Sequence, residues 1–491
     1  MHFYPLVRNN FQLGVILFFL SIAGTSKEQT VPFSANTRKD VISPTALLSA
    51  YIQIPSISGN ENKAADFLME QCRKRGLIIT KITDSTGCSN FAASVYPLKP
   101  GKPNIIFLNH IDVVPPGDSS GWKHPPFEGY TGNGKVWGRG TLDNKGMAII
   151  QLFAVKGFVD TARVIDLPYN ITILCVSGEE TGGAKGSAIV SKKFKEMFNP
   201  VLVIGEGGSG MVGTGFLPEG RTFFGISVAE KGFLWLKLSC RIEGAGHAAI
   251  AGSDYANEHM IKGLSRLVQK RQPVEMTSET KQMFHGIGKQ MVGIKGFAVR
   301  HLNWIIFRPA LNRYVNRNHE LEPVFSNTFT ISGLGNQISS SNRNIQEATA
   351  YVDCRFLPGT SPAALMELLN KQIADKRIHI DVLQECPKQF STSPELFYNH
   401  LAGAIQQTFP GSVVVPILLP ASTDNSYYRA SGCPVYGLNP MILSKDQIAS
   451  IHNYDEYIEV EAIEKGIQVF DTFLRSVLMP VNPASELMHP R

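Results

Sequence analysis

The chain has 491 residues, of which 43% are hydrophobic, so it is too long for one compact core and has enough apolar residues for two domains. Its net charge of +6 is modest. The lysines and arginines are scattered among acidic residues, and we find no long basic run or basic face interleaved with aromatic residues, which argues against nucleic acid as a partner.

The N-terminus is separate from the predicted fold. Arg8 precedes an apolar stretch from Phe11 to Ala23, and the small residues Gly24 to Ser26 follow. This pattern predicts a secretory signal peptide over residues 1–25. Its apolar core is shorter than the ~20 residues that a membrane-spanning helix needs, although an uncleaved signal anchor is the alternative. We therefore expect a secreted protein; a membrane-anchored protein, or one in a lysosome or vacuole lumen, is the alternative localisation.

The first candidate motif comes at the end of a predicted buried strand. The apolar run Ile105 to Leu108 is followed by His110 and Asp112. Parallel sheets place their chemistry at such strand ends. Because residues two apart point the same way, Asp112 can accept the proton of the His110 ring nitrogen that does not face a metal. The alternative is a histidine that only makes a structural hydrogen bond.

The second motif places a carboxylate in a glycine-flanked turn. Asp143 precedes the apolar segment Met147 to Phe158, which has the length and composition of a helix. A carboxylate has two oxygens and can bridge two cations. The alternative is that Asp143 merely caps the helix.

Three further motifs supply acids and a histidine. The predicted strand Ile171 to Val176 leads into the adjacent pair Glu179 and Glu180, of which one can bind a metal while the other moves a proton. A second predicted strand ends at Glu206, and His452 precedes a short acidic and aromatic stretch. A surface acidic pair is the alternative for the two glutamates. Together the five motifs supply ligands for two metal ions that share one carboxylate, which predicts a metal-dependent hydrolase.

The five motifs NHIDVVPPG, VWGRGTLDNKG, ILCVSGEETGGAKGS, VLVIGEGG and SIHNYDEYIEV resemble those of a known family. It is the aminoacylase and carboxypeptidase S group of zinc metallopeptidases, the peptidase M-twenty family. The resemblance implies two zinc ions per subunit. The implied ligands are His110, Asp143 and Glu206 for one ion and Asp143, Glu180 and His452 for the other.

The resemblance also implies a catalytic mechanism. Glu179 would be the general base, taking a proton from water between the metals and delivering it to the departing amine. Asp112 would support catalysis by orienting His110. The family usually has a cis peptide bond after the bridging aspartate, which here joins Asp143 to Asn144.

A second, smaller domain is implied by the family and matched by the pattern between Ala229 and about Cys386. The expected order is β-α-β-β-α-β, typical of a ferredoxin-like fold. Its strands are predicted in EKGFLWLKLSC, FSNTFTISG, ATAYVDCRF and IHIDVL, and its helices over 254–270 and 361–375.

The predicted fold class is therefore α/β, with a mostly parallel central sheet flanked by helices and an inserted α+β lid or dimerisation domain. The predicted boundaries are 1–25 for the signal segment, 26–228 for the first part of the catalytic domain, 229–386 for the lid and 387–491 for the second part.

Three lid residues match substrate-contacting positions of the family. In relatives the lid forms a homodimer, and a histidine matching His247 reaches the partner's active site. Asn342 would donate to a carbonyl or oxyanion, and Arg355 would bind a free carboxylate through two hydrogen bonds. A salt bridge with a lid acid is the alternative for Arg355. Thr423 and Asp424 lie in another loop that lines the family's site.

Some positions depart from the family pattern. Gly205 stands where many relatives have an aspartate, two alanines follow His247 where serines are common, and Asn342 begins NRNIQ instead of NVIP. None of these departures removes a proposed ligand. They concern the fit of the oxyanion and substrate pockets.

Within the family, the segments ISVAEKGFLWLKL and STDNSYY resemble the carboxypeptidase S branch and its secreted N-fatty-acyl-amino acid synthase/hydrolases. The apolar stretch Phe284 to Phe325 is typical of lid core or a dimer contact; contact with an acyl chain, a lipid or a lipoprotein is the alternative. The leading hypothesis is a hydrolase or synthase of N-acyl amino acids. A carboxypeptidase acting on short peptides is the second, and a catalytically inactive secreted binding protein the third.

Seven cysteines without CxxC pairs argue against a disulfide scaffold or a thiolate zinc site, although one or two disulfides are allowed. Asn170, Ile171 and Thr172 form the sole glycosylation sequon, at the start of a predicted strand.

Overall fold

The structure is a computed structural model. It describes residues 42–83, 87, 89–98, 101–212, 220–243, 254–318, 321–336 and 344–479. The predicted signal segment lies outside these residues. Among the described residues, no helix is both long and apolar enough to cross a membrane. The described cysteines are six in number, all free and buried.

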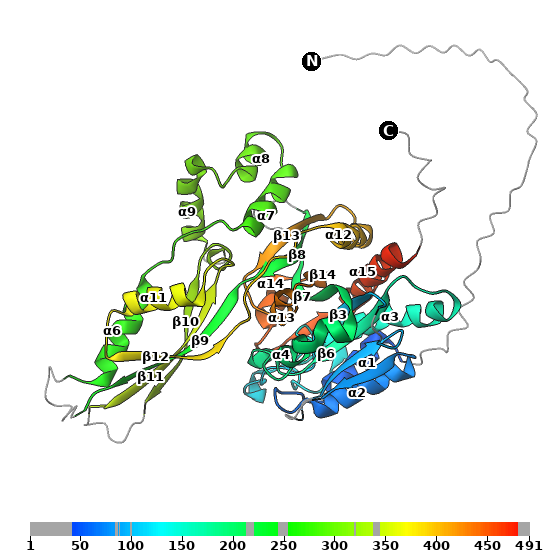
Figure 1. Cartoon of the computed structure of the whole chain (residues 1–491), viewed down its shortest axis with the longest axis horizontal. Helices are drawn as coiled ribbons and strands as arrows, with labels where there is room; N and C mark the ends of the chain where they lie inside the picture. Colours follow the sequence, from blue (N-terminus) through cyan, green and yellow to red (C-terminus); the bar gives the residue numbers. More distant parts are fainter. Residues whose placement is uncertain are drawn as a thin grey trace, which may run out of the picture. The chain divides into compact units, whose positions relative to one another are not determined.

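An eight-stranded sheet forms the centre of the fold (Figure 1). Its strands, in spatial order, are β1 (Ile78–Ile82), β2 (Asn90–Ser94), β6 (Asn170–Val176), β3 (Asn104–His110), β7 (Pro200–Val212), β14 (Val435–Ile442), β8 (Thr222–Glu230) and β13 (Val413–Leu419). The neighbours β6, β3, β7 and β14 run parallel, and antiparallel pairs occur toward both edges. The predicted mostly parallel sheet is confirmed.

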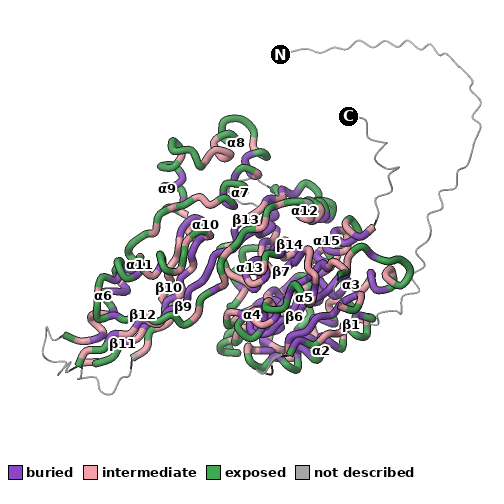
Figure 2. The backbone as a smooth tube through the Cα atoms, viewed as in Figure 1, coloured by how far each residue is buried: buried purple, intermediate pink, exposed green. Residues whose placement is uncertain are grey.

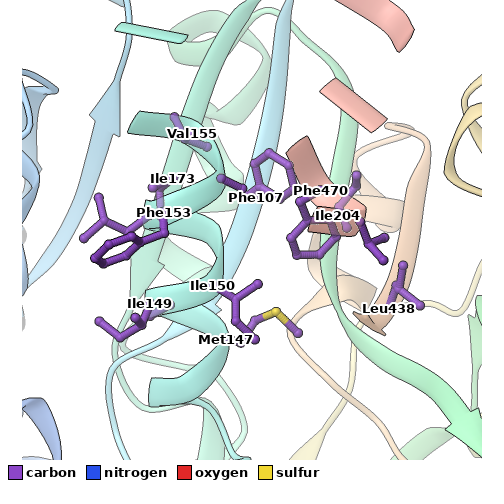
Figure 3. Close-up of a cluster of buried hydrophobic side chains, with 14 of the residues drawn as sticks. Phe107, Met147, Ile149, Ile150, Phe153, Val155, Ile173, Ile204, Leu438 and Phe470 are labelled. Atoms are coloured by element: carbon purple, nitrogen blue, oxygen red, sulfur yellow. The ribbon is translucent and has the colours of Figure 1, made fainter. Parts of the chain in front are cut away.

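Apolar residues bury both faces of this sheet. In β3, Ile105 and Phe107 point into one core, and Ile106 and Leu108 point into the other. Figure 3 shows the first core, where Phe107 lies beside Phe470. The continuous apolar run that predicted β3 therefore reflects burial on two sides.

Helices cover the two faces. The larger core includes side chains from α1 (Pro44–Ile52), α2 (Asn62–Lys74), α3 (Lys145–Val164), α12 (Leu396–Thr408) and α15 (Val460–Leu478). The other includes α4 (Ser187–Val190), α5 (Phe194–Phe198) and α13 (Asn425–Ala430). The remaining short elements are η1 (Ser119–Gly121), η2 (Glu179–Thr181), η3 (Ser191–Lys193), α14 (Lys445–Ser450) and a small sheet of β4 (Thr131–Gly132), β5 (Lys135–Trp137) and β15 (Tyr457–Glu459).

Strand β7 differs from the prediction that it ends at Glu206. It continues to Val212 because new partners replace β3, whose pairing with β7 stops at Ile204. Beyond that point β7 pairs with β14 and β8. Gly208 permits this close approach, since a Cβ there would lie 2.2 Å from the Gly225 carbonyl oxygen. Glycine-rich sequence is typical of a turn, which is why the sequence suggested an early end.

A separate four-stranded antiparallel sheet has the predicted ferredoxin-like order. Its strands are β10 (Thr328–Asn336), β11 (Glu347–Phe356), β9 (Gly232–Arg241) and β12 (Ile378–Glu385), in that spatial order. Helices α6 (Ala256–Gln269) and α11 (Pro362–Ile373) contribute side chains to the core of this unit. Ser361 caps α11 by accepting a hydrogen bond from the Ala364 amide, 3.2 Å away.

The sequence between α6 and β10 holds further helices that the ferredoxin-like pattern does not require. They are α7 (Ser278–Lys289), α8 (Gly293–Arg300), η4 (Ile305–Phe307), α9 (Arg308–Arg317) and α10 (Glu322–Phe325). Phe284, Leu311 and Val315 of this insertion pack with Val413 and Val415 of β13. Part of the stretch from Phe284 to Phe325 is thus core, as one of the two interpretations held.

Candidate active site

The predicted ligands meet at the carboxyl ends of the central parallel strands. His110 is the last residue of β3, Glu180 lies in η2 just after β6, and Glu206 lies in β7. Strands β6, β3 and β7 are neighbours in the sheet. Because their carboxyl ends share one edge, residues distant in the sequence converge there.

The first ligand group surrounds the buried ring of His110. Its Nε2 lies 2.9 Å from Asp143 Oδ1 and 3.6 Å from Glu206 Oε2. Asn144 donates a hydrogen bond from Nδ2 to Glu206 Oε2 at 3.0 Å, which orients that carboxylate. His110, Asp143 and Glu206 together meet the spacing required of a metal site.

The second group uses the other oxygen of the same aspartate. His452 Nε2 lies 3.1 Å from Asp143 Oδ2 and 3.1 Å from Glu180 Oε2. Asp143, Glu180 and His452 also meet the spacing of a metal site. The two oxygens of Asp143 therefore face different histidines, as a carboxylate that bridges two cations must. The backbone of His452 is left-handed with φ of 60°, a strained conformation for a residue with a side chain.

The charge of the cluster suits cations. Burial raises the pKa of Glu180 and Glu206, while the His110 ring opposes the rise for both. Although burial acts in the opposite direction, hydrogen bonds from His110 and His452 hold the pKa of Asp143 below its ordinary value. Glu180 Oε1 is buried without a hydrogen-bond partner. Several carboxylates with an unsatisfied oxygen and two imidazoles form the ligand chemistry that zinc binds.

Glu179 stands beside this cluster. Its carboxylate, with His110 and Glu180, forms a third group whose ligand atoms lie within 4.8 Å of one another. Burial, followed by the Glu206 carboxylate, raises the pKa of Glu179 well above its ordinary value. A carboxylate of raised basicity beside a metal site is suited to accept a proton.

Asp112 makes different contacts from those predicted. The His110 Nδ1 atom lies 2.9 Å from the Asp112 backbone carbonyl oxygen, and the carboxylate is farther away at 3.6 Å. The carboxylate accepts hydrogen bonds from the backbone amides of Glu179 and Glu180, each at 3.1 Å, and from Ser58 at 2.7 Å. Asp112 thus orients the His110 ring chiefly through its backbone and holds the turn of the two glutamates through its side chain.

A buried acid that the sequence did not single out holds the Asp143 loop. Glu456 accepts hydrogen bonds from Arg139 Nη1 at 2.6 Å and from the Gly140, Leu142 and Asp143 amides at 3.0, 2.8 and 3.2 Å. It is fully buried. Its position four residues after His452 was the only available signal, because nothing local marks the loop that it contacts.

The peptide bond between Asp143 and Asn144 is cis, as the resemblance implied.

The loop after β13 closes another side of the site. Thr423, Asp424 and Asn425 line a small cavity with His110 and Glu206. Asn425 Nδ2 donates to the Glu206 backbone carbonyl oxygen at 2.8 Å. Burial raises the pKa of Asp424 to about 8. The sequence named Thr423 and Asp424 without a role, and it missed Asn425.

The carbonyl of Gly182, two residues beyond Glu180, is held from two directions. Tyr427 donates its hydroxyl to the Gly182 oxygen at 2.7 Å, and Gln384 of β12 donates its Nε2 at 2.8 Å. Neither contact follows from a sequence motif.

The three predicted substrate-contacting residues are not brought together in the described part of the chain. His247 and Asn342 lie outside the described residues. Arg355 pairs with the Asp353 carboxylate, with Nε 2.9 Å from Oδ1 and Nη2 3.0 Å from Oδ2. This is the salt bridge with a lid acid that the sequence left as the alternative, so carboxylate binding by Arg355 stays a prediction.

Comparison with known proteins decides the family. The model of peptidase family M20/M25/M40 matches residues 106–476, which include all the proposed metal ligands. The chain belongs to this family. Family membership and the two ligand groups that share Asp143 make it a metal-dependent amide hydrolase.

Two relatives indicate different branches. The chain is 28% identical to a probable carboxypeptidase S-like 2 of Dictyostelium discoideum over 374 residues, 74% of this chain and 70% of the relative. It is 26% identical to the N-fatty-acyl-amino acid synthase/hydrolase PM20D1 of Bos taurus over 482 residues, 92% of this chain and 91% of the relative.

The fold is also that of a solved structure, the M20 family metallo-carboxypeptidase Sso-CP2 from Sulfolobus solfataricus. The TM-score is 0.69 at 20% identity, over 88% of this chain and 99% of the other.

Proposed function

We propose that the protein is a secreted di-zinc hydrolase of N-acyl amino acids, with N-fatty-acyl amino acids as its favoured substrates. The observation that carries the proposal is the shared carboxylate: each oxygen of Asp143 faces one histidine, and Glu179 lies beside the pair. The PM20D1 relative, which spans nearly the whole chain, supports the choice of substrate.

The metals would supply one part of the chemistry. Held by the two ligand groups, two zinc ions would polarise the amide carbonyl and raise the acidity of the attacking water. The protein's residues do the rest. Glu179 takes the water proton and passes it to the departing amine, while Asp112 keeps the Glu179 amide in place.

The lid completes the site in this proposal. His247 and Asn342 hold the carbonyl oxygen as it gains charge, and Arg355 exchanges its Asp353 contact for the substrate carboxylate. His247 would come from the partner subunit of a homodimer. By microscopic reversibility the same groups can join a fatty acid to an amino acid, in a direction set by concentrations.

A second candidate is a carboxypeptidase acting on short peptides. The carboxypeptidase S-like relative supports it. Both reactions break an amide bond next to a free carboxylate, so the same catalytic residues serve both. The width and polarity of the pocket for the acyl group distinguish them.

The test is hydrolysis of oleoyl-phenylalanine, acetyl-methionine and glycyl-leucine by purified mature protein, with chelator and zinc add-back. Glu179→Gln should abolish cleavage while metal content is retained. Glu196→Gln, at an exposed acid of α5, is the matched control and should leave the rate unchanged.

Zinc-dependent cleavage of the oleoyl substrate alone supports the proposal. Preference for glycyl-leucine would assign the protein to the carboxypeptidases. A protein that binds no metal and cleaves nothing would be an inactive binding protein, the third hypothesis.

A further inference from the structure

The insertion between α6 and β10 has an apolar face that does not pack against the rest of the described protein and stays exposed to solvent. Its inner side is fixed, because Phe284, Ile287 and Val315 are at most 3% exposed and pack in the cluster that includes β13. The outer residues are therefore held in place by a packed core beneath them. Their exposure does not arise from a loosely attached segment.

Val292, helix α8, the loop after it and η4 form this outer face, which we call the α8–η4 face. Its six large exposed residues are Val292, Ile294, Phe297, Trp304, Ile305 and Ile306. Val292 and Ile294 are 92% and 87% exposed, and Ile305 and Ile306 are 79% and 69% exposed. Figure 2 shows that exposed residues dominate the tube around α8. Neighbouring apolar side chains so open to water mark a binding surface.

The aromatic residues of the face contact one another, edge to face for Phe297 and Trp304 and tilted for His301 and Trp304. The ring centroids of Phe297 and Trp304 lie 5.6 Å apart, and those of His301 and Trp304 lie 4.4 Å apart. These contacts restrict the Trp304 side chain, which is 44% exposed. A partly exposed tryptophan beside aliphatic residues is typical of proteins that sit at the boundary between water and lipid.

The charge of the insertion has one sign. From Thr280 to His319 the chain has no Asp or Glu and seven basic residues: Lys281, Lys289, Lys295, Arg300, Arg308, Arg313 and Arg317. The balance of the whole chain conceals this local excess. Lys295 and Arg308 are exposed and lie within α8 and directly after η4.

We propose that the α8–η4 face docks the protein on the surface of an anionic phospholipid bilayer. The aliphatic and aromatic side chains would enter the headgroup region, and the surrounding cations would contact lipid phosphates and carboxylates. The inference is independent of the proposed substrate, since it uses no residue of the active site.

Two other occupants fit the face less well. A nucleic acid or another soluble polyanion would use the cations but would leave Ile305 and Ile306 in water. A second copy of the chain, joined through a two-fold axis, would bring the same cations opposite one another. A bilayer with acidic headgroups can bury the apolar side chains and pair with the cations at the same time.

The test is flotation of the purified mature protein with phospholipid vesicles. We expect binding to phosphatidylcholine vesicles that contain about a quarter phosphatidylserine, and binding at least about tenfold weaker to phosphatidylcholine alone. Raising the salt from about 0.1 M to about 0.5 M should weaken the binding, because the screening length shortens.

Two double variants separate the contributions. Ile305→Ser with Ile306→Ser removes exposed aliphatic area and should reduce vesicle binding about tenfold. Lys295→Glu with Arg308→Glu should reduce it by a similar factor. The matched controls are Val164→Ser, at an 84% exposed valine of α3, and Lys193→Glu, at an exposed lysine of η3; both should bind as the unchanged protein does.

The proposal is overturned if the protein does not bind anionic vesicles. It is also overturned if the Ile305→Ser, Ile306→Ser variant binds them as strongly as the unchanged protein does. Loss of binding only in the charge variant would identify a polyanion site. A mass that doubles in sedimentation and returns to that of a monomer in the isoleucine variant, without vesicle binding, would identify a contact between copies. Circular dichroism and zinc content equal to those of the unchanged protein show that each variant is folded.

Discussion

Replacing Glu456 by glutamine should destabilise the fold and weaken metal binding at once. The carboxylate accepts four hydrogen bonds, two at each oxygen: Arg139 and the Gly140 amide at Oε2, and the Leu142 and Asp143 amides at Oε1. In glutamine one oxygen becomes an NH2 group. Whichever way the amide turns, two donors then face a donor instead of an acceptor.

The magnitude follows from the contacts that remain. If the amide faces Arg139, a charged hydrogen bond is lost. Among the described residues, the buried guanidinium then keeps the Asn453 carbonyl oxygen at 2.9 Å and the face of the Trp122 ring. Breaking one side of a buried ion pair costs about 3–5 kcal/mol. We expect a loss near the lower end, about 3 kcal/mol, because glutamine also removes the cost of burying the Glu456 charge, which is seen as a raised pKa of that carboxyl.

The metal effect has a separate readout. Since Glu456 holds the amide of Asp143, a shifted loop would misplace the shared carboxylate, and zinc affinity should fall about 10–100-fold. The assays are urea unfolding of the zinc-free protein and competition for zinc with a chromophoric chelator. Glu459→Gln, at the exposed end of β15, is the matched control. If Glu456→Gln unfolds within about 0.5 kcal/mol of the control and binds zinc equally well, the reasoning is refuted.

Three further predictions follow from other buried polar groups. Asp112→Asn leaves a backbone amide of Glu179 or Glu180 without its acceptor, so zinc affinity should fall about tenfold or more in chelator competition; unchanged affinity would contradict the assigned contacts. Burial lowers the pKa of Lys231 from 10.5 to about 7, so the unfolded chain binds more protons between these values. We therefore compare the free energy of unfolding of the unchanged protein with that of Lys231→Met. The difference, unchanged protein minus variant, should rise between pH 7 and 10.5 by up to about 1.4 kcal/mol per pH unit. A difference that does not change with pH would exclude the lowered pKa of Lys231. Asn170 is 2% exposed, and its side-chain amide accepts a hydrogen bond from the Tyr96 amide and donates one to the Tyr96 carbonyl oxygen. Mass spectrometry of the protein expressed through the secretory pathway of eukaryotic cells should therefore find no glycan there, and a glycosylated, folded protein would disprove the buried placement.

Local patterns in the sequence carried much of the prediction. The apolar runs before His110 and Glu179 identified β3 and β6, because a strand buried on both faces needs a continuous apolar segment. Alternation of residues in EKGFLWLKLSC likewise identified β9 of the four-stranded sheet. The ligand types were visible as well, since metal chemistry restricts them to a few side chains.

The sequence by itself thus determined the family, the β-α-β-β-α-β order of the smaller domain and the residues of the two ligand groups. Only the tertiary structure decided which groups support them: Glu456 joins a loop more than three hundred positions away, and Asp112 turns its carboxylate to the glutamate amides. The same holds for the insertion, whose inner face is hidden by β13 while its outer face stays open. The physical reason is that periodicity reports burial along one element. Hydrogen bonds and packing between distant elements depend on the order of strands in the sheet, which no local pattern records.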